Sequence, residues 1–217
     1  GAGSNSTKHA IEMTKEAADL GADATLQVNP YYNKPTQEGL YRHFSAIAKA
    51  ADIPVVVYNI KGRTGVNVET ATLARLAREH SNIMAVKEAS GDMVQVQDVI
   101  NILPKEFSVL QGNDDLTFPT MKIGGKGIIS VASNIIPKEM HQLAQYSLDG
   151  DFAKAEKIHN ELMPLFKAEF IETNPIPIKA ALAMKGMIKE VYRLPLCEMK
   201  TENREKLRQI LKDLKIV

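Results

Sequence analysis

Short apolar runs rich in β-branched residues recur along the chain, and each is followed by a longer stretch with helical periodicity. This alternation constrains the fold most, because repeated β-α units are typical of a parallel sheet covered by helices. We expect five strands, and they lie near 24–29, 54–59, 83–88, 107–112 and 127–131. The helices expected with them lie near 6–20, 38–51, 68–80, 92–103, 115–123 and 137–148.

The C-terminal third shows helical periodicity alone, without a strand pattern. It predicts an amphipathic helix that ends near residue 170 and two more helices near 176–187 and 201–214. The sequence Asn174-Pro175-Ile176-Pro177 separates the first of these from the second. We therefore expect a β/α body at 1–150 and a C-terminal helical domain at 151–217.

Three residues at predicted helix ends support these boundaries. Gly21 follows the first helix, where glycine is favoured because it adopts left-handed backbone angles without strain. Asp92 precedes the fourth helix and can cap it, while Pro137 suits the first turn of the sixth.

Five strands are fewer than the eight that close a (β/α)8 barrel, which takes about 250 residues. The chain begins with glycine, and Gly1-Ala2-Gly3-Ser4-Asn5 resembles a loop that follows a strand. We therefore expect either an open sheet or a barrel chain whose N-terminal strands are missing. Bare edges of such a sheet should drive association with other chains or local disorder.

Composition excludes several classes of partner. The 217 residues are 44 % hydrophobic and 24 % charged, with a formal net charge of +1 and no basic run that would favour nucleic acid or an anionic membrane. No apolar stretch approaches the roughly 18 residues of a membrane span, and no leader is expected. The single cysteine, Cys197, cannot form an internal disulfide, and no Cys/His cluster has metal-ligand spacing. We expect a cytoplasmic protein whose partners are small molecules or copies of itself.

Polar residues follow four of the predicted strands. In parallel β/α folds the residues that act lie at the carboxyl ends of strands and in the loops after them. These segments are 29–33, 58–65, 87–90 and 112–115. We expect them to meet at one edge of the sheet.

Lys87 ends an apolar run, where partial desolvation favours the neutral amine and its attack on a carbonyl. Taken alone, it is more simply a strand-end lysine that extends to solvent or pairs with Glu88. Two neighbours change this interpretation. The phenol of Tyr58 can transfer the protons that Schiff-base chemistry requires, and the planar fork of Arg63 suits a substrate carboxylate. Each has an equally simple structural role, but together they favour a Schiff base between Lys87 and a 2-keto acid.

Ordered motifs along the chain strengthen this hypothesis. They are Pro30-Tyr31-Tyr32-Asn33-Lys34-Pro35, Tyr58-Asn59, Gly62-Arg63-Thr64-Gly65, Lys87-Glu88-Ala89-Ser90-Gly91-Asp92, Gly124-Gly125-Lys126-Gly127-Ile128-Ile129-Ser130-Val131 and Asn174-Pro175-Ile176-Pro177-Ile178-Lys179. Over essentially its whole length the chain resembles the pyruvate-dependent class I aldolases typified by dihydrodipicolinate synthase and N-acetylneuraminate lyase. The resemblance implies a (β/α)8 TIM barrel, here incomplete because its first three strands are missing, with a C-terminal helical domain. It also implies a homotetramer that needs no cofactor.

The resemblance further implies a reaction. Pyruvate would condense with Lys87, the enamine would attack aspartate semialdehyde, and cyclisation would give the precursor of diaminopimelate and lysine. By the same resemblance Tyr58 would move protons and Tyr32 would reach into the site of a neighbouring subunit. Arg63 would bind the carboxylate of the semialdehyde, which favours the synthase branch over the sialic-acid lyases.

The remaining expected site residues also come from the resemblance. Gly112 and Ile129 would line the pyruvate pocket. Asn5 and Tyr31 match a lysine-feedback pocket, but His9 stands where a glutamate is frequent, so feedback inhibition is left open.

Three further departures from the family pattern matter. The family's Gly-Thr-Thr-Gly-Glu loop, whose threonine links the two phenols, has no counterpart in the chain. Asn113 stands where an aspartate is common, and Ile60-Lys61 replaces the usual Val-Pro. Two alternatives therefore stay open: another pyruvate-dependent aldolase of the family, and an inactive fragment that acts only as an associating scaffold.

Overall fold

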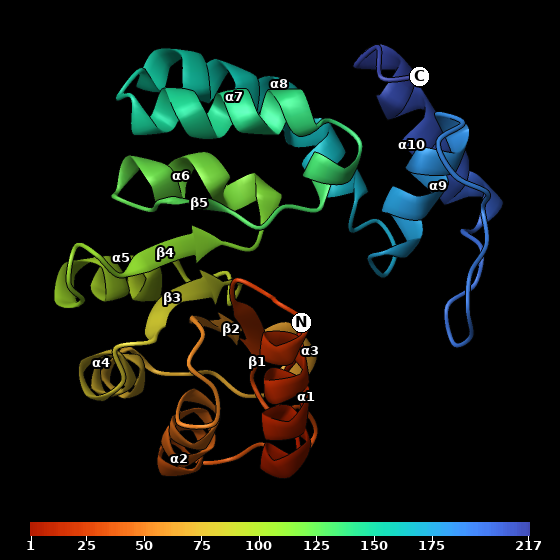
Figure 1. Ribbon diagram of the computed structural model, residues 1–217. Helices are drawn as coiled ribbons and strands as arrows, with labels where there is room; N and C mark the ends of the chain where they lie inside the picture. Colours follow the sequence, from red (N-terminus) through yellow and green to blue (C-terminus); the bar gives the residue numbers. More distant parts are fainter. The chain divides into compact units, whose positions relative to one another are not determined.

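The computed structural model describes residues 1–217 (Figure 1). Its strands form one five-stranded sheet in the order β1-β2-β3-β4-β5, and the pairs from β1 to β4 are parallel. The strands are β1 (Thr25–Val28), β2 (Val55–Asn59), β3 (Ile83–Glu88), β4 (Ser108–Gln111) and β5 (Gly127–Ile128). Each strand lies within its predicted range, so the prediction of a parallel sheet is confirmed.

The longer helices also lie where helical periodicity places them. Those interleaved with the strands are α1 (Thr7–Asp19), α2 (Gln37–Ala48), α3 (Lys61–Thr64), α4 (Thr70–Glu79), α5 (Met93–Ile102), the short 3-10 helix η1 (Asp114–Leu116) and α6 (Thr117–Lys122). Those after β5 are the 3-10 helix η2 (Ala132–Asn134), α7 (Pro137–Leu148), α8 (Phe152–Ala168), α9 (Ile176–Met184) and α10 (Thr201–Asp213).

The three predicted helix-end residues behave as expected. Gly21 has a φ of 81°, in the left-handed region that glycine adopts without strain. The Asp92 carboxylate accepts hydrogen bonds from the backbone N–H of Val94 (3.0 Å) and Gln95 (3.1 Å), which satisfies two free donors at the start of α5. Pro137 is the first residue of α7.

The segment after β2 differs from the prediction, since it forms the helical turn α3 and not a loop. The carbonyl of Ile60 accepts hydrogen bonds from the N–H of both Arg63 and Thr64, at 3.1 Å each. Gly65 then ends the turn with a φ of 76°. Arg63 is therefore carried by a short helix whose backbone fixes its direction.

β5 is shorter than predicted, because it ends at Ile128 and not near residue 131. The backbone beyond it turns into η2 and donates to a buried carboxylate. Asp114 accepts from the N–H of Val131 (2.9 Å) and of Ala132 (3.3 Å). These bonds replace the ladder that would have continued the strand.

Contacts divide the chain differently from the predicted domains. One unit comprises Gly1–Gly112 with Ile123–Gly127, and the other comprises Asn113–Lys122 with Ile128–Val217. The difference arises because α6 and α7 pack against α8 and so group with the C-terminal helices. The division at residue 150, where the strand pattern ends, stays a prediction.

In the first unit, α1, α2, α4 and α5 pack against one face of the sheet (Figure 1). The core there consists of buried side chains from alternate strand positions and from the helices. Its members include Val55, Val57, Val86, Val109, Leu40, Phe44, Leu73, Leu76, Val96 and Val99. Because strand residues alternate between faces, the residues between these valines point to the other face of the sheet.

The second unit is mainly helical. In this unit α7 packs on α8, and α10 packs on both α8 and α9. Its core is formed by side chains of these helices that are at most 1 % exposed: Leu143, Leu165, Phe166, Leu207 and Leu211.

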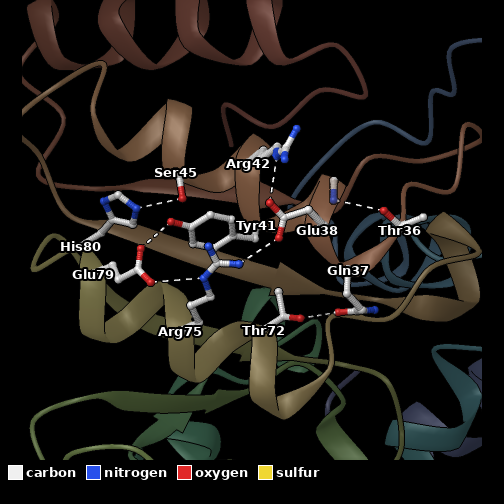
Figure 2. A network of polar contacts seen from close by, with 11 residues as sticks. Thr36, Gln37, Glu38, Tyr41, Arg42, Ser45, Thr72, Arg75, Glu79 and His80 are labelled. Carbon is white, nitrogen blue, oxygen red and sulfur yellow. Dashed lines mark hydrogen bonds and ion pairs between the residues drawn. The ribbon is translucent and has the colours of Figure 1, made fainter.

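A polar network joins α2 to α4 on the surface of the first unit (Figure 2). The Arg75 guanidinium lies 3.4 Å from the centroid of the Tyr41 ring and pairs with Glu38 (2.9 Å) and Glu79 (3.2 Å). Tyr41 in turn donates its hydroxyl hydrogen to Glu79. A single arginine therefore links two carboxylates and an aromatic ring across the helix pair.

Replacing Arg75 with alanine should lower the melting temperature by a few degrees at low salt, since it removes two ion pairs and the stacked ring contact together. The difference should shrink at 1 M NaCl, which screens exposed charges. Arg42→Ala is the matched control, because Arg42 pairs only with Glu38 (2.9 Å) in this network and its side chain is 77 % exposed. Equal losses for the two variants would contradict the bridging role.

Candidate active site

β2 and β3 place Tyr58 and Lys87 side by side at their carboxyl ends. The strand register pairs Tyr58 with Lys87 and Asn59 with Glu88. Because neighbouring strand residues point to opposite faces, Tyr58 and Lys87 share the face away from the helices. Asn59 and Glu88 point into the helix-covered face, where each is 1 % exposed. The structure thus brings together two residues that the sequence singled out, while their chemical roles stay predictions.

The Lys87 amine lies over the Tyr58 ring, with Nζ 4.1 Å from the ring centroid. Burial raises the pKa of the Tyr58 phenol, and the positive charge of Arg63 acts in the opposite direction. The phenol is therefore protonated near neutral pH and can donate to an oxygen that is bound at Lys87. Arg63, in α3, belongs to the same edge of the sheet, as expected from the sequence.

Gly112, directly after β4, lies against the side chain of Lys87. A Cβ atom at this position would meet Ala89 Cβ at 2.7 Å and Lys87 Cε at 2.9 Å, both closer than carbon atoms pack. The Gly112 N–H donates to the carbonyl of Glu88 at 2.8 Å and fixes this approach. Only a glycine leaves this room beside the lysine.

The sequence leads us to expect a pyruvate adduct at Lys87, and a Gly112→Ala variant should form it about tenfold more slowly, because the added methyl group must displace Lys87 or Ala89. The rate of adduct formation is measured by quenching with borohydride at increasing times. Gly62→Ala serves as the control, since a Cβ at Gly62 would meet no atom within 4 Å. Equal rates for the two variants would show that Gly112 does not shape the site.

Two other expected site residues lie in other segments of the chain. Tyr32 follows β1, is 90 % exposed and has a φ of 73°, a strained backbone angle for a tyrosine. Ile129 belongs to the second unit, directly after β5. Their roles in the site stay predictions.

The two residues of the expected lysine pocket do meet. Asn5 Nδ2 donates to the carbonyl of Tyr31 at 3.2 Å. The side chain of Asn33 donates to the carbonyl of Asn5 at 3.0 Å and links the same two segments from the other side. The segment before α1 and the segment after β1 therefore form one surface feature.

Glu88 has partners of its own on the helix-covered face, so a simple pairing with Lys87 does not describe it. Its carboxylate accepts from the side chain of Asn59 (3.0 Å) and from the N–H of Ser90 (2.8 Å). It also accepts from Gln95 at 3.3 Å. Burial raises the pKa of Glu88, and these hydrogen bonds act against that rise.

The second unit holds a buried pair of carboxyl groups that the sequence did not reveal. Asp114 and Glu169 are each 1 % exposed, and each shifts the pKa of the other. Asp114 accepts from the hydroxyl of Ser130, whereas neither oxygen of Glu169 has a hydrogen-bond donor as its partner. Burial first and the charge of Asp114 second raise the pKa of Glu169 to about 9. The only sequence signal is an acidic residue at a helix position whose neighbours are apolar.

No group of three or more His, Cys, Asp or Glu side chains is arranged to hold a metal ion. None of the helices combines the length and the apolar character that crossing a bilayer requires.

Comparison with known proteins agrees with this geometry. The model of the dihydrodipicolinate synthetase family matches residues 1–214. The chain belongs to this family. It is therefore a member of a family of class I aldolase-type lyases, and the expected enzyme class is confirmed.

Individual members of the family are similar over the whole chain. The 4-hydroxy-tetrahydrodipicolinate synthase of Methanocaldococcus jannaschii is 52 % identical over 217 residues, which are 100 % of this chain and 74 % of that protein. A crystal structure of dihydrodipicolinate synthase from Aquifex aeolicus superposes with a TM-score of 0.98 at 48 % identity, covering 100 % of this chain and 74 % of that one. The chain thus spans about three-quarters of the length of these relatives, and the barrel-family fold is confirmed.

A third relative carries a ligand. The chloride-inhibited dihydrodipicolinate synthase of Acinetobacter baumannii, solved in complex with pyruvate, has a TM-score of 0.97 at 45 % identity. The superposition covers 100 % of this chain and 74 % of the Acinetobacter baumannii chain.

Proposed function

We propose that this chain condenses pyruvate with L-aspartate 4-semialdehyde to give 4-hydroxy-tetrahydrodipicolinate, a step of lysine and diaminopimelate biosynthesis. The observation that carries this proposal is the position of the Lys87 amine, 4.1 Å from the Tyr58 ring centroid and against the bare backbone of Gly112. The names of the family members and the pyruvate bound by one of them support the choice of substrates.

The proposed chemistry uses the amine as a nucleophile. Lys87 attacks the keto carbon of pyruvate, and the carbinolamine loses water with a proton supplied by Tyr58. The Tyr58 phenolate left by this step accepts a methyl proton, which gives the enamine. The enamine carbon then attacks the aldehyde of the semialdehyde, whose oxygen takes the proton from Tyr58 and becomes a hydroxyl group. The amino group of the semialdehyde then attacks the imine carbon, closes the ring and releases Lys87. One water leaves for each product formed.

The other predicted residues take supporting roles in this proposal. Arg63 binds the carboxylate of the semialdehyde, because a guanidinium offers two parallel donors to a carboxylate. Ile129 contributes apolar lining to the pyruvate pocket. Asn5 and Tyr31 belong to a surface site for lysine, whose effect on the rate is left open.

The exposed Tyr32 phenol suits a role in a second copy of the chain, and we include a homotetramer in the proposal. The strained backbone of Tyr32 directs a large side chain outward, where a neighbouring subunit can accept it. The free, exposed Cys197 is compatible with a reducing cytoplasm, where we place the reaction.

The acceptor preference of the chain tests this function. With pyruvate and aspartate semialdehyde the chain should give the cyclic product, and with an N-acetylated amino sugar it should give none. An Arg63→Ala variant should lose about 10- to 100-fold in kcat/KM for the semialdehyde, as a charged hydrogen-bonding partner is removed, yet still bind pyruvate. Lys61→Ala, in the same turn, is the control.

Two outcomes would replace the proposal. Turnover of the sugar acceptor without turnover of the semialdehyde would identify another aldolase of the family. A folded chain that forms no pyruvate adduct and turns over neither acceptor would identify a non-catalytic scaffold.

A further inference from the structure

A closed ring of hydrogen bonds lies behind the strand ends that carry Tyr58 and Lys87. Asn59 Nδ2 donates to Asn67 Oδ1 (2.7 Å), and Asn67 Nδ2 donates to Gln95 Oε1 (2.7 Å). Gln95 Nε2 donates to Glu88 Oε2 at 3.3 Å, and Asn59 Nδ2 closes the ring on the same oxygen at 3.0 Å. None of its four members is on the face of the sheet that carries the amine.

Backbone groups of Val68 fix the direction of every bond in the ring. The N–H of Val68 can only donate, and it does so to Asn59 Oδ1 at 3.1 Å. The carbonyl of Val68 can only accept, and it does so from Gln95 Nε2 at 3.0 Å. Turning over either amide would set donor against donor or acceptor against acceptor. The orientation of both amides is therefore determined.

With these directions fixed, three donors point at Glu88. They are the amide groups of Asn59 and Gln95 and the backbone N–H of Ser90, at 2.8 Å. The hydroxyl of Ser90 also contacts the carboxyl group. A carboxylate at position 88 can accept from all three donors.

We propose that Asn59 and Glu88 are positioning residues that hold the Tyr58 phenol and the Lys87 amine in register for Schiff-base formation. Each directly follows one of the reacting residues, so the ring ties the end of β2 to the end of β3. Asn29 extends the tie to β1, because its Nδ2 donates to Asn59 Oδ1 at 2.9 Å. This inference rests on the proposed function. Misplacing a reacting group by about 1 Å can slow a reaction about 100-fold. A ring of hydrogen bonds that fixes the positions of the strand ends therefore affects the rate.

The test is the kinetics of adduct formation in a Glu88→Gln variant. The amide keeps the shape of the side chain, but its NH2 group must face either the backbone N–H of Ser90 or the two donors of the ring. The maximal rate of borohydride-trapped adduct at saturating pyruvate should fall about 10- to 100-fold. The pyruvate concentration for half-maximal rate should change less than about threefold, because no ring member contacts the amine's face of the sheet.

Moving the acid along the ring provides a rescue. Asn59→Asp alone sets two carboxylates against each other and should also be slow. In the double variant Asn59→Asp with Glu88→Gln, the new carboxylate can accept from the new amide. The repulsion between two carboxylates is gone, so the double variant should react faster than Asn59→Asp alone. If Glu88→Gln does not fold, Asn67→Ala replaces it, because it breaks the ring at a half-buried position. Its maximal rate should fall by less, again with little change in the pyruvate concentration for half-maximal rate.

Ser45→Ala controls for a general loss of stability. It removes the hydrogen bond between Ser45 and His80 (2.8 Å), whose carbonyl accepts from Ile83 at the opposite end of β3. Even if Ser45→Ala loses as much stability as Glu88→Gln, it should keep the wild-type rate of adduct formation.

The outcomes separate this inference from the proposed function. A folded Glu88→Gln variant with the wild-type rate, or a rate loss shared by Ser45→Ala, would overturn the positioning role alone. A wild-type chain that forms no adduct would overturn both.

Discussion

A Lys87→Met variant should form no pyruvate adduct and should lose at least about 10⁴-fold in turnover, because it lacks the amine that is proposed to form the imine. Methionine keeps the length and apolar stem of lysine, so the side chain still fits beside Gly112. Lys87→Arg keeps the positive charge and should be equally inactive, since a guanidinium does not form the Schiff base. Product formation under saturating substrates measures both losses.

The control for both variants is Lys61→Met, which removes an exposed lysine from α3 at the same edge of the sheet. It should keep most of the wild-type turnover. If Lys87→Arg retained more than about 1 % of the turnover, lysine would be acting through its charge and not as a nucleophile.

A Glu169→Gln variant should be more stable than the wild type at pH 8, by on the order of 2–4 kcal/mol, and nearly equal to it at pH 4.5. In the folded chain the pKa of Glu169 is raised from 4.5 to about 9, first by burial and then by Asp114. Between these values the unfolded chain has released a proton that the folded chain retains. Stability therefore falls as the pH rises through this window.

Glutamine reproduces the protonated form of Glu169, because its amide can donate to Asp114 and does not titrate. Urea denaturation of both chains at pH 4.5 and pH 8 measures the difference. Glu161→Gln in α8, the helix that Glu169 directly follows, is the control, since the Glu161 side chain is 60 % exposed. If Glu169→Gln changed the free energy of unfolding equally at both pH values, Glu169 would not be the buried group whose raised pKa lowers stability at high pH.

Much of the fold could be predicted because its signals are local. Each signal, such as the β-branched run at Val55–Val57 or the helix starts at Asp92 and Pro137, acts on residues that are close to it in the sequence. The helical turn around Arg63 was missed because its bonds to the carbonyl of Ile60 require a backbone direction that no side chain reveals.

The candidate site was predictable to the extent that it lies on strand ends. That rule places Lys87 and Tyr58 at one edge of the sheet, while their chemical roles were predicted from their combination with Arg63 and from the family resemblance. The ring through Asn59 and Glu88 does not, because it depends on partners from the segment before α4 and from α5. The pair of Asp114 and Glu169 likewise joins positions far apart in the sequence.

Borohydride reduction in the presence of pyruvate, followed by mass spectrometry of the intact chain and of its peptides, tests the central claim most directly. The chain should gain the mass of one reduced pyruvate, and the modified peptide should carry it on Lys87. An unmodified chain, or a modification that persists on another lysine when Lys87 is replaced, would contradict the claim that Lys87 is the Schiff-base nucleophile.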